Sequence, residues 1–181
     1  PGAAYAEAGL ALHKQRSGEE GCLLEDLNFS QALVVSHGTE PLLRLCADPH
    51  SPRFQIHSKS KEEWTLHAKG SFHQLWNGYS PLALPMEEIL QKCPHEVPTQ
   101  EIYKQFAGSG LHYGSSFQLI HRLHKGHGEA LAELHLPEQA HDYLLYPPLL
   151  DAALQTLIGT KEGGQFHNHL LLPVHIQQLH F

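Results

Sequence analysis

The stretch YPPLLDAALQ, residues 146–155, predicts a helix that begins at Pro147 and is apolar on almost every side. Proline suits the first turn of a helix, because the N–H that it lacks would have no partner there. A second helix is predicted over residues 1–15, which also opens with proline and holds mainly small or apolar residues. A helix that is apolar all round must be buried. We therefore expect two central helices, each inside its own half of the fold.

Strand-like segments accompany each of these helices. Apolar and polar residues alternate in them, as at Phe54 and Ile56, which is the period of a half-buried strand. The predicted strands lie in residues 22–35, 41–48, 53–59, 62–73, 117–125, 128–137 and 170–181. The predicted fold class is therefore α+β, with two antiparallel sheets that are each wrapped round a central helix.

Four prolines mark the predicted boundary between the halves. They are Pro81, Pro85, Pro94 and Pro98, and only a short helical segment at 86–93 interrupts them. The predicted domains are an N-terminal half over 1–80, a linker over 81–98 and a C-terminal half over 99–181. Thr99 is predicted to cap a short helix that follows the linker.

Composition excludes several classes of protein. The chain has 181 residues and a formal net charge of −7, which disfavours nonspecific binding to nucleic acid. No apolar run reaches the roughly eighteen residues of a membrane span, and the first residues lack the basic start of a signal peptide. Three scattered cysteines without a CxxC pair, Cys22, Cys46 and Cys93, indicate reduced thiols in a cytoplasmic protein.

Seventeen histidines raise the question of a metal site. On a strand, His121 and His127 would share one face and His124 would lie on the other. His167 and His169 form a pair without a clear third ligand, whereas a structural zinc site needs four nitrogen or sulfur ligands. We therefore predict no metal, and we expect the histidines to lie at the surface.

Asp151 is a single carboxylate in the apolar helix, and Gln155 lies one turn further along the same face. Burial would raise the pKa of this carboxyl, whereas the dipole at the helix N-terminus would lower it. A carboxyl with a raised pKa can donate a proton near neutral pH. The alternative is that Asp151 caps the helix or pairs with a histidine.

A second motif, GLHYGSSFQ at residues 110–118, places Tyr113 and Phe117 in a glycine-rich turn. Gly114 would allow a positive φ angle or the close approach of a ligand to the backbone. Taken alone, this motif is more typical of a β-turn with two aromatic residues of the core.

Together with PGAAY at residues 1–5, these two motifs resemble the dehydratase domain of modular type I polyketide synthases. LLLPVHIQQLHF at residues 170–181 is similar to the strand that follows the catalytic helix in that family. The resemblance covers essentially the whole chain, and its most specific part is the Asp-Ala-x-x-Gln sequence of Asp151 and Gln155. It implies a double hot-dog fold, here truncated at both ends, because the first strand of one half and the last strands of the other are expected to be missing.

The resemblance also implies a reaction. The family removes water from a β-hydroxyacyl chain that is tethered to acyl carrier protein through phosphopantetheine, and the product is an α,β-unsaturated thioester. By this carry-over, Asp151 would protonate the leaving hydroxyl, and Gln155 would orient either the Asp151 carboxyl or the hydroxyl. No cofactor would be needed. The expected substrate-binding residues are Tyr113, Gly114, Phe117, Tyr146, Leu150 and Pro173.

The chain departs from the family pattern at three places. The catalytic histidine of the family lies in a His-x-x-x-Gly-x-x-x-x-Pro motif, of which Pro1 is the last residue, so the base is expected upstream of residue 1. Tyr146 stands where the family usually has histidine. Ser115 stands where the family has the proline of Tyr-Gly-Pro.

These departures leave two alternatives open. One is an isomerase or cyclising variant, in which Asp151 moves protons without net loss of water. The other is a non-catalytic pseudo-dehydratase that serves as a scaffold in a megasynthase. The expected partners are acyl carrier protein, neighbouring domains and a second copy of the chain, with Arg122 and Lys125 as candidate contacts for the acidic carrier.

Overall fold

The structure is a computed structural model that describes residues 2–36, 38–60, 62–75, 80, 83–160 and 172–181. The chain forms two compact units. The first contains residues 1–79, 143–147 and 172–181, and the second contains residues 80–142 and 148–171. No helix within the described ranges is long and apolar enough to cross a membrane.

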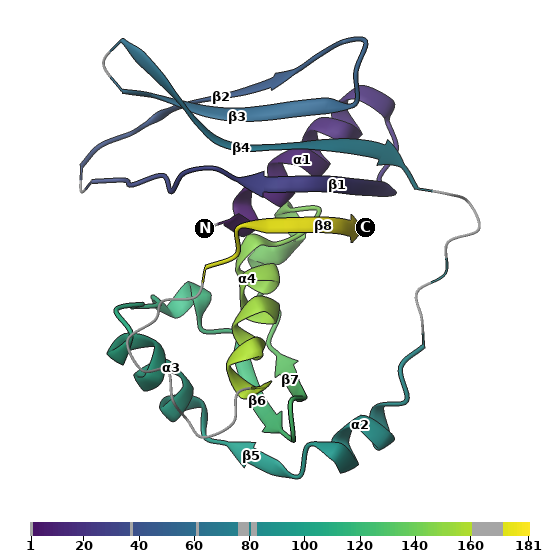
Figure 1. Ribbon diagram of the computed structural model, residues 1–181, viewed down its shortest axis with the longest axis vertical. Coiled ribbons are helices and arrows are strands. Elements are labelled where there is room, and N and C mark those ends of the chain that lie inside the picture. The colour runs from purple at the N-terminus through teal and green to yellow at the C-terminus, as the bar shows by residue number, and fades with distance from the viewer. Residues whose placement is uncertain (1, 37, 61, 76–79, 81–82, 161–171) are drawn as a thin grey trace. The chain divides into compact units, whose positions relative to one another are not determined.

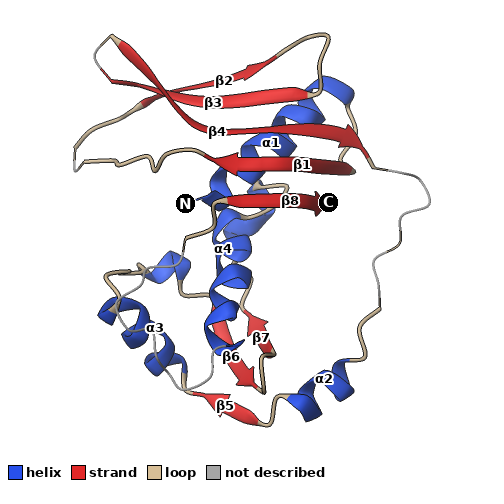
Figure 2. Ribbon diagram, in the orientation of Figure 1, coloured by secondary structure: helices blue, strands red, loops and turns tan. Residues whose placement is uncertain are grey.

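The first unit is an antiparallel sheet with one long helix against it (Figures 1 and 2). The strands follow one another across the sheet in the order β2-β3-β4-β1-β8. The elements are α1 (Gly2–Ser17), β1 (Cys22–Phe29), β2 (Leu42–Ala47), β3 (Arg53–Ser60), β4 (Glu63–Gln74) and β8 (His175–His180). The predicted strand over 22–35 ends early, at Phe29, and Val34 and Val35 are exposed.

Helix α1 packs on the sheet through Leu10 and three small residues at helical spacing, Ala3, Ala6 and Gly9. A Cβ atom on Gly9 would lie 2.8 Å from Cζ of Phe54, so glycine is what allows the helix to approach the strands so closely. The helix is not buried all round, because Ala11 on its far side is exposed. Since the alanines and glycines of α1 lie on several sides of the helix, composition alone could not show which side faces the sheet.

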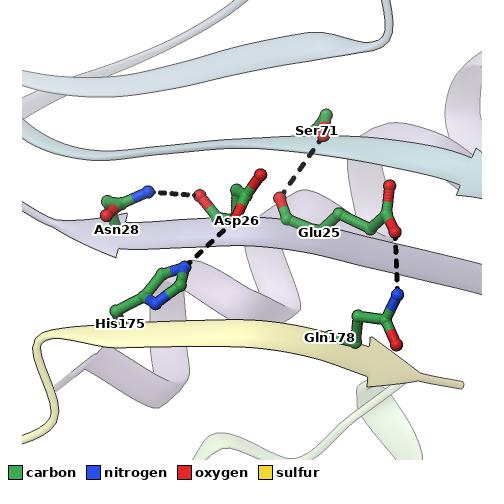
Figure 3. Close-up of polar contacts among 6 residues, drawn as sticks. All are labelled: Glu25, Asp26, Asn28, Ser71, His175 and Gln178. Atoms are coloured by element: carbon green, nitrogen blue, oxygen red, sulfur yellow. Dashed lines mark hydrogen bonds and ion pairs between the residues drawn. The ribbon is translucent and has the colours of Figure 1, made fainter.

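Strand β8 pairs antiparallel with β1, from Leu23 opposite His180 to Asn28 opposite His175. Side chains reinforce this pairing, as Figure 3 shows: Gln178 donates to Glu25 over 2.9 Å, and His175 lies 3.3 Å from Asp26. Asp26 has a positive φ of 49°, at the point where the register between β1 and β4 shifts. This β-bulge turns Asp26 out of the ladder and towards β8.

The pairing of β8 corrects the predicted domain boundaries. Residues 172–181 were expected in the C-terminal half, but they complete the sheet of the first unit, and residues 143–147 also belong to that unit. Helix α2 (Met86–Lys92) lies where a short helix was predicted inside the linker. The predicted linker over 81–98 is wrong in part, because it also contains strand β5 (His95–Val97), and both elements belong to the second unit.

The second unit holds a smaller antiparallel sheet, in the order β5-β6-β7, and several helices (Figure 2). Its other elements are α3 (Thr99–Gly108), η1 (Ser115–Phe117), β6 (Ile120–Lys125), β7 (Ala130–Leu134), η2 (Glu138–Asp142), α4 (Pro147–Gln155) and η3 (Thr156–Thr160). Thr99 does not cap α3 as predicted. Its backbone is already helical, the N-cap is Pro98, and its hydroxyl donates to the carbonyl oxygen of His121 instead.

Helix α4 continues into η3, which packs against β6 and β7. A Cβ atom on Gly159 would lie 2.8 Å from Cβ of Ala130, so this turn also relies on glycine for close approach. Ala152 and Ile158 are buried, but Leu157 is 59% exposed, so the prediction that the helix is buried on every side is wrong.

Candidate functional site

Asp151 and Gln155 face each other on α4, one turn apart. Nε2 of Gln155 donates a hydrogen bond to Oδ2 of Asp151 over 2.7 Å. Asp151 is the fifth residue of the helix, which begins at Pro147, so it does not cap it. The predicted contact between the two side chains is therefore present, and the alternative of a helix cap is wrong.

The turn after α3 supplies the second contact of Gln155. Nε2 of Gln155 also donates to the carbonyl oxygen of Phe117 over 3.1 Å. The amide has two hydrogens on this nitrogen, one for each acceptor. A reversed amide would place its oxygen against the Phe117 carbonyl, so this carbonyl fixes the orientation of the amide. Gln155 is buried, and its other polar atom, Oε1, has no hydrogen-bond partner among the described residues.

Burial raises the pKa of the Asp151 carboxyl, and the hydrogen bond from Gln155 opposes part of this rise because it stabilises the charged form. The sequence left open whether burial or the helix dipole would prevail, and burial does. A partly buried carboxyl with a raised pKa holds its proton at higher pH than an exposed aspartate. This is the property that a proton donor requires.

Three aromatic side chains form a cluster in the same unit. The ring of Tyr113 meets that of Phe106 edge to face at 5.1 Å and that of Tyr103 at 6.3 Å. Burial, together with the nearby Asp151 and Tyr103, raises the pKa of Tyr113 to about 12. Tyr113 therefore keeps its proton at neutral pH and can donate a hydrogen bond, but it cannot serve as a base.

Of the two roles predicted for Gly114, the positive φ angle is absent. Gly114 has a φ of −70°, in the extended region, so the turn makes no use of a positive φ there. Nothing lies within 4 Å of the position of a Cβ atom on Gly114. The turn is closed instead by Gln118, whose side chain donates to the carbonyl oxygen of Tyr113 over 2.7 Å.

The other predicted substrate-binding residues are spread over both units. Phe117 and Leu150 are half-buried in the second unit. Tyr146 is buried in the first unit, next to the ring of Tyr143, and Pro173 is exposed on the approach to β8.

No three side chains of histidine, cysteine, aspartate or glutamate come together as a metal site in the part of the chain that the structure describes. His121 and His124 lie on β6, and His167 and His169 lie outside the described residues. Two histidines contradict the expectation of a surface position: His13 and His67 are buried. Nε2 of His67 lies 2.7 Å from the hydroxyl of Ser58, and Nδ1 lies 2.9 Å from the carbonyl of Gln31, as in a structural histidine.

Comparison with known proteins places this arrangement in a family. Residues 81–181 match the model of the polyketide synthase dehydratase N-terminal domain. Polyketide synthase PksN of Bacillus subtilis is 39% identical over 195 residues, and a subunit of the phenolphthiocerol/phthiocerol polyketide synthase of Mycobacterium tuberculosis is 28% identical over 208 residues. Each alignment covers 99% of this chain but only 4% and 9% of these relatives, respectively.

Solved structures give the same result. The dehydratase domain from the CurK module of the curacin polyketide synthase is 31% identical, with a TM-score of 0.91 over 99% of this chain and 67% of that chain. Two variants of the CurK dehydratase are described as inactive. One has phenylalanine in place of a histidine, and the other has asparagine in place of an aspartate.

The chain thus belongs to the dehydratase domains of polyketide synthases, and its fold is the double hot-dog of that family. The relatives are multidomain synthases, of which the chain spans less than a tenth.

Proposed function

We propose that this chain removes water from a β-hydroxyacyl thioester during polyketide synthesis. The substrate is carried on the phosphopantetheine arm of acyl carrier protein, and the product is an α,β-unsaturated thioester. The observation that carries the proposal is the half-buried Asp151, which has a raised pKa and receives a hydrogen bond from the oriented amide of Gln155. Family membership supports the reaction class.

Asp151 is the proposed acid. Hydroxide is a poor leaving group, so a proton must reach the β-hydroxyl as the carbon–oxygen bond breaks. A well-placed acid contributes roughly a hundred- to ten-thousandfold to such a step. Gln155 holds the carboxyl in place through Oδ2, which leaves Oδ1 to face the hydroxyl. The inactive asparagine variant of the CurK dehydratase supports an essential aspartate in this family.

The proposed base is a histidine that precedes Pro1 in the complete polypeptide, at the start of the His-x-x-x-Gly-x-x-x-x-Pro motif. It removes the proton from the α carbon, and the electron pair of that C–H bond forms the double bond as the hydroxyl leaves as water. The inactive phenylalanine variant of the CurK dehydratase supports a histidine in this role. The two protons are thus handled by two residues with opposite tasks.

The remaining proposed residues bind the acyl chain and the thioester. Tyr113, a hydrogen-bond donor at neutral pH, is suited to a substrate oxygen, and Phe117 and Leu150 are suited to the acyl chain. Gly114 leaves room beside Tyr113. Tyr146 and Pro173 are also proposed to contact the substrate.

The chemistry proposed here needs no cofactor, because proton transfer between side chains and substrate accounts for all the electrons. The proposed partners are acyl carrier protein, the neighbouring domains of the synthase and a second copy of the chain. Three free cysteines support a reducing compartment, the cytoplasm.

The test is mass spectrometry of a β-hydroxyacyl chain on carrier protein, incubated with the complete polypeptide and with its Asp151→Asn variant. We expect the natural protein to remove one water from the substrate, and the variant, which keeps the hydrogen bond from Gln155, to be folded and slower by at least about a hundredfold. Normal turnover of the variant would remove Asp151 from the mechanism. Movement of a double bond without loss of water would favour the isomerase alternative, and no reaction of a folded natural protein would favour the scaffold.

A further inference from the structure

Glu7 of α1 makes two hydrogen bonds that the proposed chemistry does not use. Its Oε1 accepts from the backbone N–H of Leu144 over 3.2 Å, and its Oε2 accepts from that of Leu145 over 2.7 Å. All three residues belong to the first unit, and the contact is partly buried. The carboxylate therefore spans two consecutive amides of a segment that lies 137 and 138 positions further along the chain.

The segment held by Glu7 leads directly into α4. Tyr146 follows Leu145, and Pro147 and Pro148 form the first turn of the helix. The ring of a proline fixes its φ angle, and it also restricts the residue before it to extended conformations. The backbone from Leu145 to the first turn of α4 is therefore unusually stiff, so a fixed position at Leu145 is passed on to the start of the helix.

Asp151 lies one helical turn after Pro147. We infer that Glu7 is a positioning residue of the dehydratase: its carboxylate holds the backbone from which α4 starts, and so holds Asp151 at the place where it meets the substrate. This inference rests on the proposed function. Glu7 would then position Asp151 through the backbone, in addition to the hydrogen bond from Gln155.

A carboxylate is the side chain that suits this task. Two N–H donors point at it, and each of its two oxygens can accept. Glutamine has a single acceptor oxygen, and its NH₂ group would face an N–H. Aspartate is one methylene shorter. Alanine would leave both amides without an acceptor in a partly buried position, which is unfavourable.

The first experiment measures the contact itself, without any reaction. Hydrogen exchange of the peptide containing Leu144 and Leu145 is followed by mass spectrometry in the complete polypeptide and in its Glu7→Gln and Glu7→Ala variants. We expect exchange of these amides to become at least about tenfold faster in both variants, because a lost hydrogen bond exposes them to local opening. Unchanged exchange would overturn the inference, whatever the activity.

The second experiment separates positioning from substrate binding. With a β-hydroxyacyl carrier protein as substrate, we expect both Glu7 variants to lose about ten- to a hundredfold in kcat, because a displacement of about 1 Å has costs of this size. KM is expected to change less than about twofold, since Glu7 does not touch the substrate. A control is Glu20→Gln, which removes only the exposed ion pair of Glu20 with Lys14, at 2.7 Å, and should leave kcat unchanged.

The outcomes keep the two claims apart. A natural protein that does not dehydrate would refute the proposed function, but the exchange experiment would still test the contact. A natural protein that dehydrates, together with Glu7 variants whose kcat is normal or whose loss is entirely in KM, would refute the positioning role alone.

Discussion

Gln155 and Asp151 are joined by a hydrogen bond of 2.7 Å whose direction is set by a third group. The carbonyl of Phe117 accepts from the same nitrogen, so the amide must present its N–H and not its oxygen to Oδ2 of Asp151. In a protonated carboxyl, the oxygen without the proton is the better acceptor. The proton of a protonated Asp151 is therefore favoured on Oδ1, which is the oxygen that would deliver it in the proposed reaction.

Replacement of Gln155 by methionine removes this donor at similar side-chain volume. The hydrogen bond from Gln155 lowers the pKa of Asp151, so its loss should raise that pKa further. Because the acid is active only when protonated, we expect the decline of kcat on the basic side to move to higher pH, with a lower maximum. The measurement is the pH profile of kcat for dehydration.

Thr156→Val is the matched control for this profile. Thr156 donates to the carbonyl of Ala152 in the same helical turn, a contact that does not involve the Asp151 carboxyl. Its profile should coincide with that of the natural protein. If the decline of kcat at high pH occurred at the same pH in Gln155→Met as in the natural protein, the assigned hydrogen bond would be contradicted.

The raised pKa of Asp151 also predicts how stability depends on pH. In the unfolded chain the carboxyl titrates near its ordinary value of 3.8, whereas in the folded protein it keeps its proton to higher pH. The unfolded state thus binds fewer protons over this interval, and the free energy of unfolding falls as pH rises through it. Asp151→Asn cannot titrate, so its stability relative to the natural protein should increase from about pH 4 to about pH 7.

Urea unfolding of both proteins at the two pH values measures this difference. If the stability of Asp151→Asn relative to the natural protein did not change with pH, or decreased as pH rises, the folded carboxyl would have no raised pKa.

The three thiols should differ sharply in reactivity. Cys22 and Cys93 are completely buried, and burial raises the pKa of the Cys22 thiol to about 11. Cys46 is partly exposed. Since the thiolate is the reactive form, a thiol reagent at neutral pH should modify one cysteine quickly in the folded chain and all three after denaturation. Replacement of all three by alanine should preserve dehydration, and a loss of turnover without loss of stability would give a thiol a role in the reaction.

Gly9→Ala should destabilise the first unit. Alanine is the better helix former by about 1 kcal/mol, but its Cβ would lie 2.8 Å from the ring of Phe54, which is itself stacked on Phe72. Overpacking of this kind costs about 1–3 kcal/mol, so we expect a net loss in the free energy of unfolding, measured with urea. Gly108→Ala, where nothing lies within 4 Å, is the control and should be neutral or stabilising.

Local sequence patterns predicted the helices and strands well, but they predicted poorly which distant segments contact one another. Alternation of apolar and polar residues located most strands, and the spacing of Asp151 and Gln155 predicted their contact, because both signals lie within a few residues. The hydrogen bond from Gln155 to the Phe117 carbonyl could not be predicted, since the direction of a backbone carbonyl depends on the conformation of the turn. Glu7 was missed for a similar reason: its acceptor role depends on amides of a distant segment, and nothing near it in the sequence marks it.

The error over residues 172–181 has a physical cause as well. The alternation in β8 shows that the segment is a strand, but an antiparallel strand carries no local signal of the sheet that it joins. Its pairing with β1 is made by a backbone ladder between distant segments. The side-chain contacts that reinforce it, Glu25 with Gln178 and Asp26 with His175 (Figure 3), join residues 153 and 149 positions apart.

This pairing has a consequence for biosynthesis. The edge of β1 that β8 occupies stays open until residues 175–180 have left the ribosome, because Leu23 pairs with His180. Meanwhile the whole second unit, residues 80–142 and 148–171, is synthesised before the last part of the first unit, residues 172–181. Contacts of such long range form slowly, and an open strand edge invites pairing with other chains. Until β8 is made, this edge of β1 is therefore open to such pairing, and once β8 is in place it covers β1 and becomes the edge strand on that side of the described sheet.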